Sequence, residues 1–202
     1  RTANYYYEKC HELVKGKDEY EEAMIYNGVG YISSAMEAYD KAFNCYNRAL
    51  TSFLQMEKID YVGETLYNMA INCIMTQDYK NAYEYLEMSF RIVKEMKMNS
   101  LRVCNISKLM GLLALCSHYI GNELKCAIYI EKTRLFLEHL IDKEYVVNEK
   151  VIVHDYTMCN DDLFIYYYIY GLQLVENEAY EEALKNFELA ESCLDESVGN
   201  QF

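Results

Sequence analysis

The sequence predicts an all-α fold built from antiparallel helix hairpins that recur along the chain. Proline is absent from all 202 residues, whereas average usage would give about ten. Because proline interrupts helices, its absence favours a chain that is helical almost throughout. Residues of one type also recur 40 positions apart, as Tyr39 and Tyr79 or Ala42 and Ala82 do. Such a fixed period is typical of a helical array.

The N-terminal half is expected to hold one single helix and two hairpins. Residues 1–15 form the single helix, and Gly16 ends it, since glycine commonly follows a helix C-terminus. We interpret it as the second helix of a hairpin whose first helix precedes this sequence, which would make the chain a piece of a longer protein. Hairpins follow at 18–56, with a turn near Glu37, and at 61–96.

The C-terminal half is expected to hold two further hairpins and an irregular insertion. The hairpin at 100–143 turns at Gly121-Asn122 and follows the period more loosely. Residues 144–160 are rich in β-branched side chains and lack a helical period, so they form either a short extended excursion or a helix extension with a loop. The clearest hairpin spans 161–195. We expect all of these elements to form a single array over residues 1–202.

Small residues mark the places where the two helices of each hairpin are expected to touch. A small side chain lets two backbones approach closely, and larger neighbours fill the space around it. Each hairpin then leaves apolar surface that the next hairpin must cover. The expected small positions are Gly30, Ala70, Ala114 and Gly171 on the first helices, and Ala42, Ala82, Cys126 and Ala183 on the second helices.

The last hairpin carries a recognisable order of residues, namely Tyr167, Tyr170-Gly171, Tyr180, Ala183, Phe187 and Ala190. Similar orders run from Tyr26 to Ala49 and from Leu66 to Ser89. This pattern resembles the tetratricopeptide repeat (TPR) family over about three quarters of the chain. The sequence departs from the family in its period, about 40 rather than 34 residues, and in lacking the closing proline. Longer helices and looser turns would explain both departures.

The resemblance implies a right-handed array of hairpins, a TPR-like α-solenoid, with a binding or relay role rather than chemistry. The elongated period is similar to that of regulatory arrays in bacterial signalling proteins. These include peptide-sensing transcription regulators and sensor regions attached to diguanylate cyclases. We therefore predict a protein- or peptide-binding regulatory or sensor module of a larger bacterial signalling protein. The alternative is a structural scaffold or dimerisation module without a ligand of its own.

The register of the repeats places a concave groove along the first helices. Tyrosine suits such a surface because it joins a large rigid face to a hydroxyl group, although these tyrosines could instead pack between repeats. The amide of Asn27 could clamp the backbone of a bound peptide. The residues expected to line the groove are Asn27, Tyr31, Ser34, Glu64, Tyr67, Ile71, Lys108, Leu115, His118, Tyr168 and Leu172.

The net charge of −13 limits the classes of partner. An acidic surface repels phosphate backbones and anionic membranes, so we expect neither direct nucleic-acid binding nor a membrane partner. The remaining classes of partner are a peptide or protein segment and a second copy of the chain. The eight cysteines include no C-x-x-C pair, and the sequence has no signal peptide and no run of 18 apolar residues. These features predict reduced core thiols and a cytoplasmic location.

No catalytic or cofactor motif occurs in the sequence. P-loops, dinucleotide-binding glycine motifs and nucleophile elbows are absent. His154, Asp155 and Cys159 lie within the insertion, where they could form a thiol–imidazole pair or ligate a metal, but no further ligand stands at a useful spacing. We therefore expect no enzyme, metal or cofactor in this segment. An attached catalytic domain, such as a diguanylate cyclase, would lie outside it.

Overall fold

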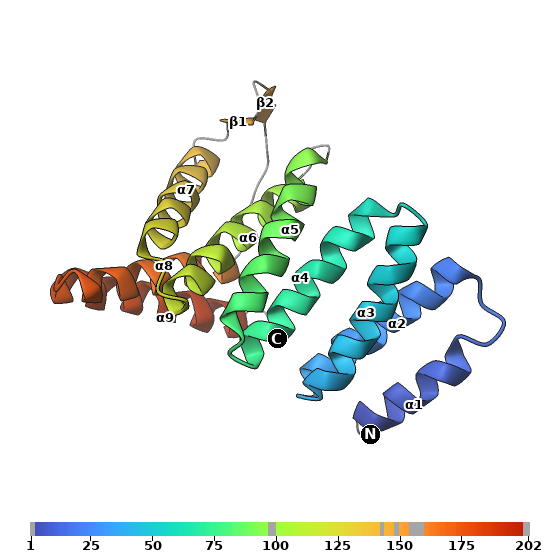
Figure 1. Cartoon of the computed structure of the whole chain (residues 1–202). Coiled ribbons are helices and arrows are strands. Elements are labelled where there is room, and N and C mark those ends of the chain that lie inside the picture. Colours follow the sequence, from blue (N-terminus) through green and yellow to red (C-terminus); the bar gives the residue numbers. More distant parts are fainter. Residues whose placement is uncertain (1–2, 97–99, 142–143, 148–149, 154–159, 200–202) are drawn as a thin grey trace. The chain divides into compact units, whose positions relative to one another are not determined.

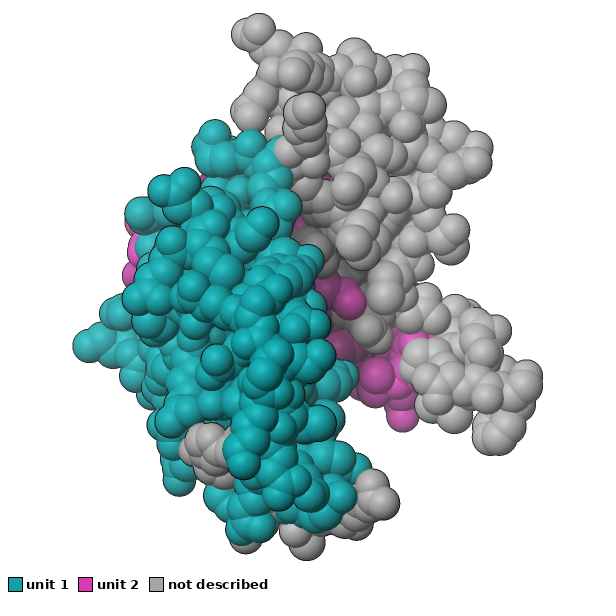
Figure 2. All heavy atoms as spheres, turned by 90° about the vertical axis from the view of Figure 1, so that its right-hand side faces the viewer, with its two compact units in different colours: residues 1–96 teal, residues 97–202 magenta. Residues whose placement is uncertain are grey.

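The computed structural model describes residues 3–96, 100–141, 144–147, 150–153 and 160–199 (Figure 1). The chain divides into two compact units, which are coloured separately in Figure 2. Unit 1 comprises residues 1–96 and unit 2 comprises residues 97–202. Apart from one short β-hairpin, every element of the described residues is a helix, which confirms the predicted helical-repeat fold class.

Unit 1 is a regular succession of helices. Each helix from α2 to α5 is 17 residues long, and three residues separate each of α2, α3 and α4 from the next helix. One helix and one turn therefore take 20 residues, and a hairpin takes the 40 residues predicted from the tyrosine and alanine spacing. The five helices are α1 (Ala3–Leu13), α2 (Glu19–Ala35), α3 (Tyr39–Gln55), α4 (Ile59–Met75) and α5 (Tyr79–Glu95).

The turns share one backbone conformation. Glu37, Glu57 and Gln77 have φ values of 60°, 55° and 62°, in the left-handed region. In the first turn the N–H of Ala38 donates to the carbonyl of Ser33 at 2.9 Å, which is the 6→1 bond of a Schellman motif. Equivalent bonds close the turns at Glu57 and Gln77 and, in unit 2, those at Gly121 and Glu178.

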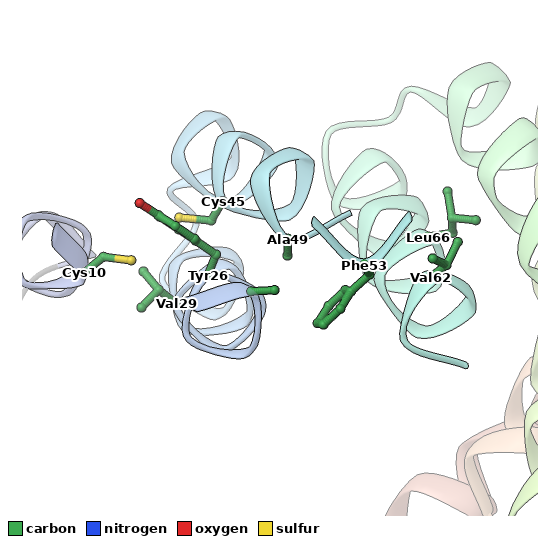
Figure 3. Close-up of a cluster of buried hydrophobic side chains, with 9 residues drawn as sticks. Cys10, Tyr26, Val29, Cys45, Ala49, Phe53, Val62 and Leu66 are labelled. Carbon is green, nitrogen blue, oxygen red and sulfur yellow. The ribbon is translucent and has the colours of Figure 1, made fainter. Parts of the chain in front are cut away.

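The core of unit 1 is shared by four successive helices (Figure 3). Phe53 of α3 is fully buried, and its ring stacks on Tyr61 of α4 with 5.1 Å between the centroids. Since α4 covers apolar side chains of the preceding hairpin, the two hairpins stabilise one another, as expected for stacked repeats. The cluster consists of Cys10, Ala23, Tyr26, Val29, Cys45, Ala49, Phe53, Val62 and Leu66.

Two of the predicted small positions are confirmed as contacts between the helices of a hairpin. A Cβ atom added to Gly30 would lie 2.6 Å from the ring of Tyr46, and one added to Gly171 would lie 2.6 Å from the ring of Phe187. In both hairpins an aromatic ring of the second helix therefore packs directly on the backbone of the first. The remaining small positions, Ala42, Ala70, Ala82, Ala114, Cys126 and Ala183, are all buried.

Unit 2 contains two helix hairpins and a β-hairpin. Helices α6 (Ser100–Tyr119) and α7 (Glu123–Ile141) form one pair, and α8 (Asn160–Glu176) and α9 (Tyr180–Gly199) form the other. Helix α8 packs against α6, where a Cβ atom on Gly111 would lie 2.7 Å from the side chain of Ile165. Between the two pairs, β1 (Glu144–Val147) runs antiparallel to β2 (Lys150–Val153).

The β-hairpin agrees with one of the two conformations predicted for the insertion, the extended one. Residues 144–147 and 150–153 form the extended excursion, because β-branched side chains favour strands. Glu144 pairs with Val153, and Val147 pairs with Lys150. His154, Asp155 and Cys159 lie outside the described residues.

Cysteines contribute to the core as small apolar residues. Six described cysteines are buried free thiols: Cys10, Cys45, Cys73, Cys116, Cys126 and Cys193. The thiol of Cys45 donates to the sulfur of Cys10, which lowers the pKa of Cys10 and raises that of Cys45. Burial is the main cause that raises the pKa of both Cys73 and Cys126 to about 11.

Candidate functional site

In unit 1 the first helices α2 and α4 lie against each other. The hydroxyl of Tyr20 donates to that of Tyr61 at 2.7 Å, near the start of both helices. Further along, Oδ1 of Asn27 lies 3.5 Å from the donors Thr65 Oγ1 and Asn68 Nδ2. Asn27 is only 7% exposed, so its amide lies within the contact between the two helices.

The other predicted groove residues of unit 1 lie closer to the surface. Tyr31 of α2 is 66% exposed, and Ser34 is half-buried. On α4, Glu64 is exposed, while Tyr67 and Ile71 are half-buried. Residues 64, 67, 71 and 75 follow the helical repeat, so they lie along one side of α4. We call this side of α4, together with Tyr31, the α2–α4 surface.

The predicted groove residues of unit 2 take part mainly in packing. On α6, Nδ1 of His118 lies 3.2 Å from Oε1 of Glu176 on α8, while Lys108 and Leu115 are half-buried. On α8, the ring of Tyr168 stacks on Phe164 at 5.9 Å and lies 6.1 Å from Phe187 of α9. Leu172 is half-buried.

A cavity of about 530 Å³, which the sequence did not predict, lies between α3, α4 and α5. On its lining, Nδ2 of Asn72 donates to the backbone carbonyl of Tyr39 at 3.2 Å. Asn72 Oδ1 is buried and finds no hydrogen-bond partner among the described residues. The lining consists of Tyr39, Asp40, Phe43, Asn44, Asn72, Cys73, Thr76, Asp78, Asn81 and Tyr85. We call it the α3–α5 cavity.

The sequence held one weak signal for this cavity. Asn72 is a buried polar residue, whereas Ile32 occupies the matching position 40 residues earlier. Since an apolar side chain can occupy this position of the repeat, the polar side chain of Asn72 is not needed for the stacking of the hairpins. The cavity also depends on side chains from three helices, and a single helical pattern cannot reveal that combination.

A smaller cleft of about 410 Å³ lies between α2 and α3. There the guanidinium of Arg48 donates to the hydroxyl of Tyr26 at 2.6 Å, and it lies 5.1 Å from the centre of the same ring. Burial raises the pKa of Tyr26, while Arg48 acts in the opposite direction. The strongest donor of this cleft is therefore already bound to a residue of the hairpin.

Comparisons with known proteins identify the architecture. No protein-family model and no curated protein sequence matches the chain. One similar structure is that of a protein named as a kinesin light chain of Podosopora anserina, with nearly identical TPR-like repeats. Its sequence is 10% identical to this chain, and the two structures superpose with a TM-score of 0.65. The match covers 96% of this chain and 86% of the other. The chain has a TPR-like fold.

Two further structures with this TPR-like fold cover nearly the whole chain. BtubC (BKLC) from P. vanneervenii has a TM-score of 0.63 at 15% identity, and the apo form of RapI has a TM-score of 0.62 at 18% identity. Each comparison covers 98% of this chain and 72% of the other. At such low sequence identities, the structural similarity shows a shared fold only.

In the TPR-like fold, the two candidate sites lie on different helices of the hairpins. The α2–α4 surface belongs to the first helices of the hairpins. The α3–α5 cavity is built mainly by the second helices and by the C-terminal end of α4.

Other classes of site receive no support from the described part of the chain. Its residues include no group of three or more His, Cys, Asp and Glu side chains that could hold a metal ion. None of its helices is both long and apolar enough to span a membrane.

Proposed function

We propose that the chain is a binding module for a peptide or protein segment, which lies along the α2–α4 surface. The observations that carry this proposal are the large exposed face of Tyr31 on α2 and, on α4, an exposed carboxylate with half-buried apolar side chains. Tyrosine and aliphatic side chains give a peptide apolar contact, and Glu64 offers an acceptor for its N–H groups. The TPR-like fold supports this choice, because repeat arrays commonly bind partners along an extended surface.

Within the contact between α2 and α4, Asn27 has a positioning role. Its Oδ1 lies 3.5 Å from Nδ2 of Asn68, while the Thr65 hydroxyl donates to the carbonyl of Tyr61 at 2.7 Å. The contact with Asn68 helps to set the spacing between α2 and α4. A change in that spacing on binding would change how successive hairpins stack. We propose that this change is relayed to an attached output domain of a larger cytoplasmic bacterial signalling protein. Within unit 2, the remaining predicted groove residues on α6 and α8 would offer a separate peptide contact.

The test is a selection of phage-displayed random peptides against the whole chain. A double variant, Tyr31→Ala with Glu64→Ala, should weaken the selected peptides at least about tenfold, as loss of a central aromatic contact does. The control is Leu54→Ala with Glu84→Ala, which removes an exposed apolar residue and an exposed carboxylate from the second helices α3 and α5. Peptides that bind both double variants equally well would refute the α2–α4 surface as the site.

A second candidate function is self-association, favoured by apolar side chains on the surface of unit 2. Leu124 of α7 is 73% exposed and Leu184 of α9 is 59% exposed. Pairing of such residues between two copies would remove apolar area from water. Light scattering over a range of protein concentrations tests it: a dimer that Leu184→Lys converts to a monomer would support the scaffold function, and a monomer throughout would exclude it.

A further inference from the structure

We propose that the α3–α5 cavity binds a guanidinium group, presented by an arginine side chain of a polypeptide. The proposal concerns the second helices and does not depend on the α2–α4 surface. It follows from the charge, the aromatic rings and the hydrogen-bond acceptors of the cavity.

The charged groups of the cavity have one sign. Asp40 and Asp78 contribute two carboxylates, and the described lining contains no Lys, Arg or His. Asp78 already accepts from the backbone N–H and the side-chain amide of Asn81, at 3.2 and 2.6 Å, and so caps α5. Asp40 is exposed in the first turn of α3, so its carboxylate is the one accessible to a cation.

Aromatic rings favour a planar cation over a compact one. Tyr39, Phe43 and Tyr85 are half-buried in the lining, and the rings of Phe43 and Tyr85 lie 6.2 Å apart at a tilt of 56°. A guanidinium is more weakly hydrated than an ammonium, stacks on aromatic faces and pairs with a carboxylate through two N–H groups. This combination of rings and a carboxylate selects arginine over lysine.

The lining also carries hydrogen-bond acceptors, which suit a ligand that is rich in donors. Asn72 Oδ1 lacks a partner among the described residues, while its Nδ2 is occupied by the carbonyl of Tyr39. The hydroxyl of Thr76 likewise already donates to the carbonyl of Cys73, at 3.0 Å. The carboxylate of Asp40 is the exposed acceptor of the lining, and arginine supplies five N–H donors and no acceptor.

The size and the overall charge agree with a polypeptide as the source. Small ligands occupy clefts of about 300–1,000 Å³, and the cavity of about 530 Å³ lies within that range. It therefore has room for an arginine side chain together with adjoining backbone. The net charge of −13 would draw a basic segment towards the chain.

The experiment is an NMR titration of the ¹⁵N-labelled whole chain. The probe is the peptide acetyl-Gly-Arg-Gly-amide, and the matched probe carries glutamine in place of arginine. We expect the arginine peptide to shift the side-chain amide signals of Asn44, Asn72 and Asn81, and the glutamine peptide to leave them unchanged. Absence of shifts at these amides, or equal shifts with both peptides, would overturn the proposal.

Two further probes identify the source and the type of cation. Free L-arginine should bind at least about threefold more weakly than the arginine peptide, since it lacks the flanking peptide groups. Equal or tighter binding of free arginine would overturn a polypeptide source. A lysine peptide that binds as well as the arginine peptide would overturn the selection for a planar cation.

A pair of charge variants provides the control. Asp40→Asn should weaken the arginine peptide about 10- to 150-fold, the usual loss for a hydrogen bond to a charged partner. Asp60→Asn removes the same charge from the same helical position of α4, also exposed but outside the lining, and should change affinity less than twofold. Equal effects of the two variants would mean that only the overall charge matters and would refute the site.

The variants distinguish binding in the α3–α5 cavity from binding on the α2–α4 surface. A peptide that binds the α2–α4 surface would lose affinity in the Tyr31→Ala and Glu64→Ala double variant and keep it in Asp40→Asn. A peptide held in the cavity would show the opposite pattern.

Discussion

Gly28 and Gly30 lie two residues apart on α2, yet their surroundings are opposite. Nothing lies within 4 Å of a Cβ atom added to Gly28, whereas one on Gly30 would overlap the ring of Tyr46. We expect Gly30→Ala to lower the free energy of unfolding by about 1–3 kcal/mol, because the ring must move. Gly28→Ala should raise it by about 0.5–1 kcal/mol, since alanine is the better helix former. Urea denaturation of both variants measures this, and equal stabilities would contradict the packing of Tyr46 on α2.

The thiols of Cys73 and Cys126 should make stability fall at alkaline pH. Burial raises both pKa values from 9.0 to about 11, so the unfolded chain loses these protons before the folded chain does. The folded state therefore keeps its full stability below pH 9 and loses part of it between pH 9 and pH 11. Denaturation at a series of pH values should show a shallower decline for Cys73→Ala than for the unmodified chain. An unchanged slope would mean that the thiol titrates alike in both states.

For Asn27, the sequence predicts the helix and the side of that helix, but not the surroundings of the side chain. Its helix and its approximate side followed from the repeat register. Its environment did not, because that depends on Thr65 and Asn68, which lie 38 and 41 positions further along the chain. The exposure of Tyr31 depends in the same way on which residues of other helices come near it. Periodicity within one helix therefore identifies a side of that helix, and only the packed structure shows what covers it.

At the scale of elements, the turns offer a test of backbone strain. Glu57 holds a left-handed φ of 55°, which costs an ordinary residue about 1 kcal/mol, whereas Gly121 holds φ 73° at no such cost. Glu57→Gly should raise the free energy of unfolding by about 0.5–1 kcal/mol, and Gly121→Ala should lower it by about 1 kcal/mol. Thermal unfolding of both variants tests the pair. A destabilised Glu57→Gly would show that the glutamate side chain has contacts that outweigh the strain.

The turns also explain why some elements were easier to predict than others. The helices followed from their periodic apolar residues and from the small contact positions. The turn at Glu57 carries neither glycine nor proline, so no residue there indicates its left-handed conformation. The N–H of Lys58 donates to the carbonyl of Phe53 at 2.9 Å and holds the turn instead. The insertion lacked a period altogether, which left its extended conformation as one of two alternatives.

At the scale of the whole molecule, unit 1 contains a complete core. Its cluster of nine buried residues comes from α1 to α4, and α5 packs on α4 through the bond from Ser89 Oγ to the carbonyl of Gly63 at 2.8 Å. In repeat arrays, stability is approximately a sum over neighbouring repeats. A fragment of residues 1–96 should therefore fold by itself, because each of its helices has a packing partner within unit 1.

The fragment also carries both proposed sites of unit 1. Circular dichroism should show helical content and a cooperative urea transition, and the arginine peptide should shift the same asparagine amides as in the whole chain. The variant Phe53→Ala provides the control: it opens a cavity beside Tyr61 in the centre of the shared core and should cost about 3–5 kcal/mol. A fragment that is helical but unfolds without cooperativity, with or without Phe53, would show that unit 1 needs unit 2 for its packing. Binding by unit 1 would then depend on the rest of the chain.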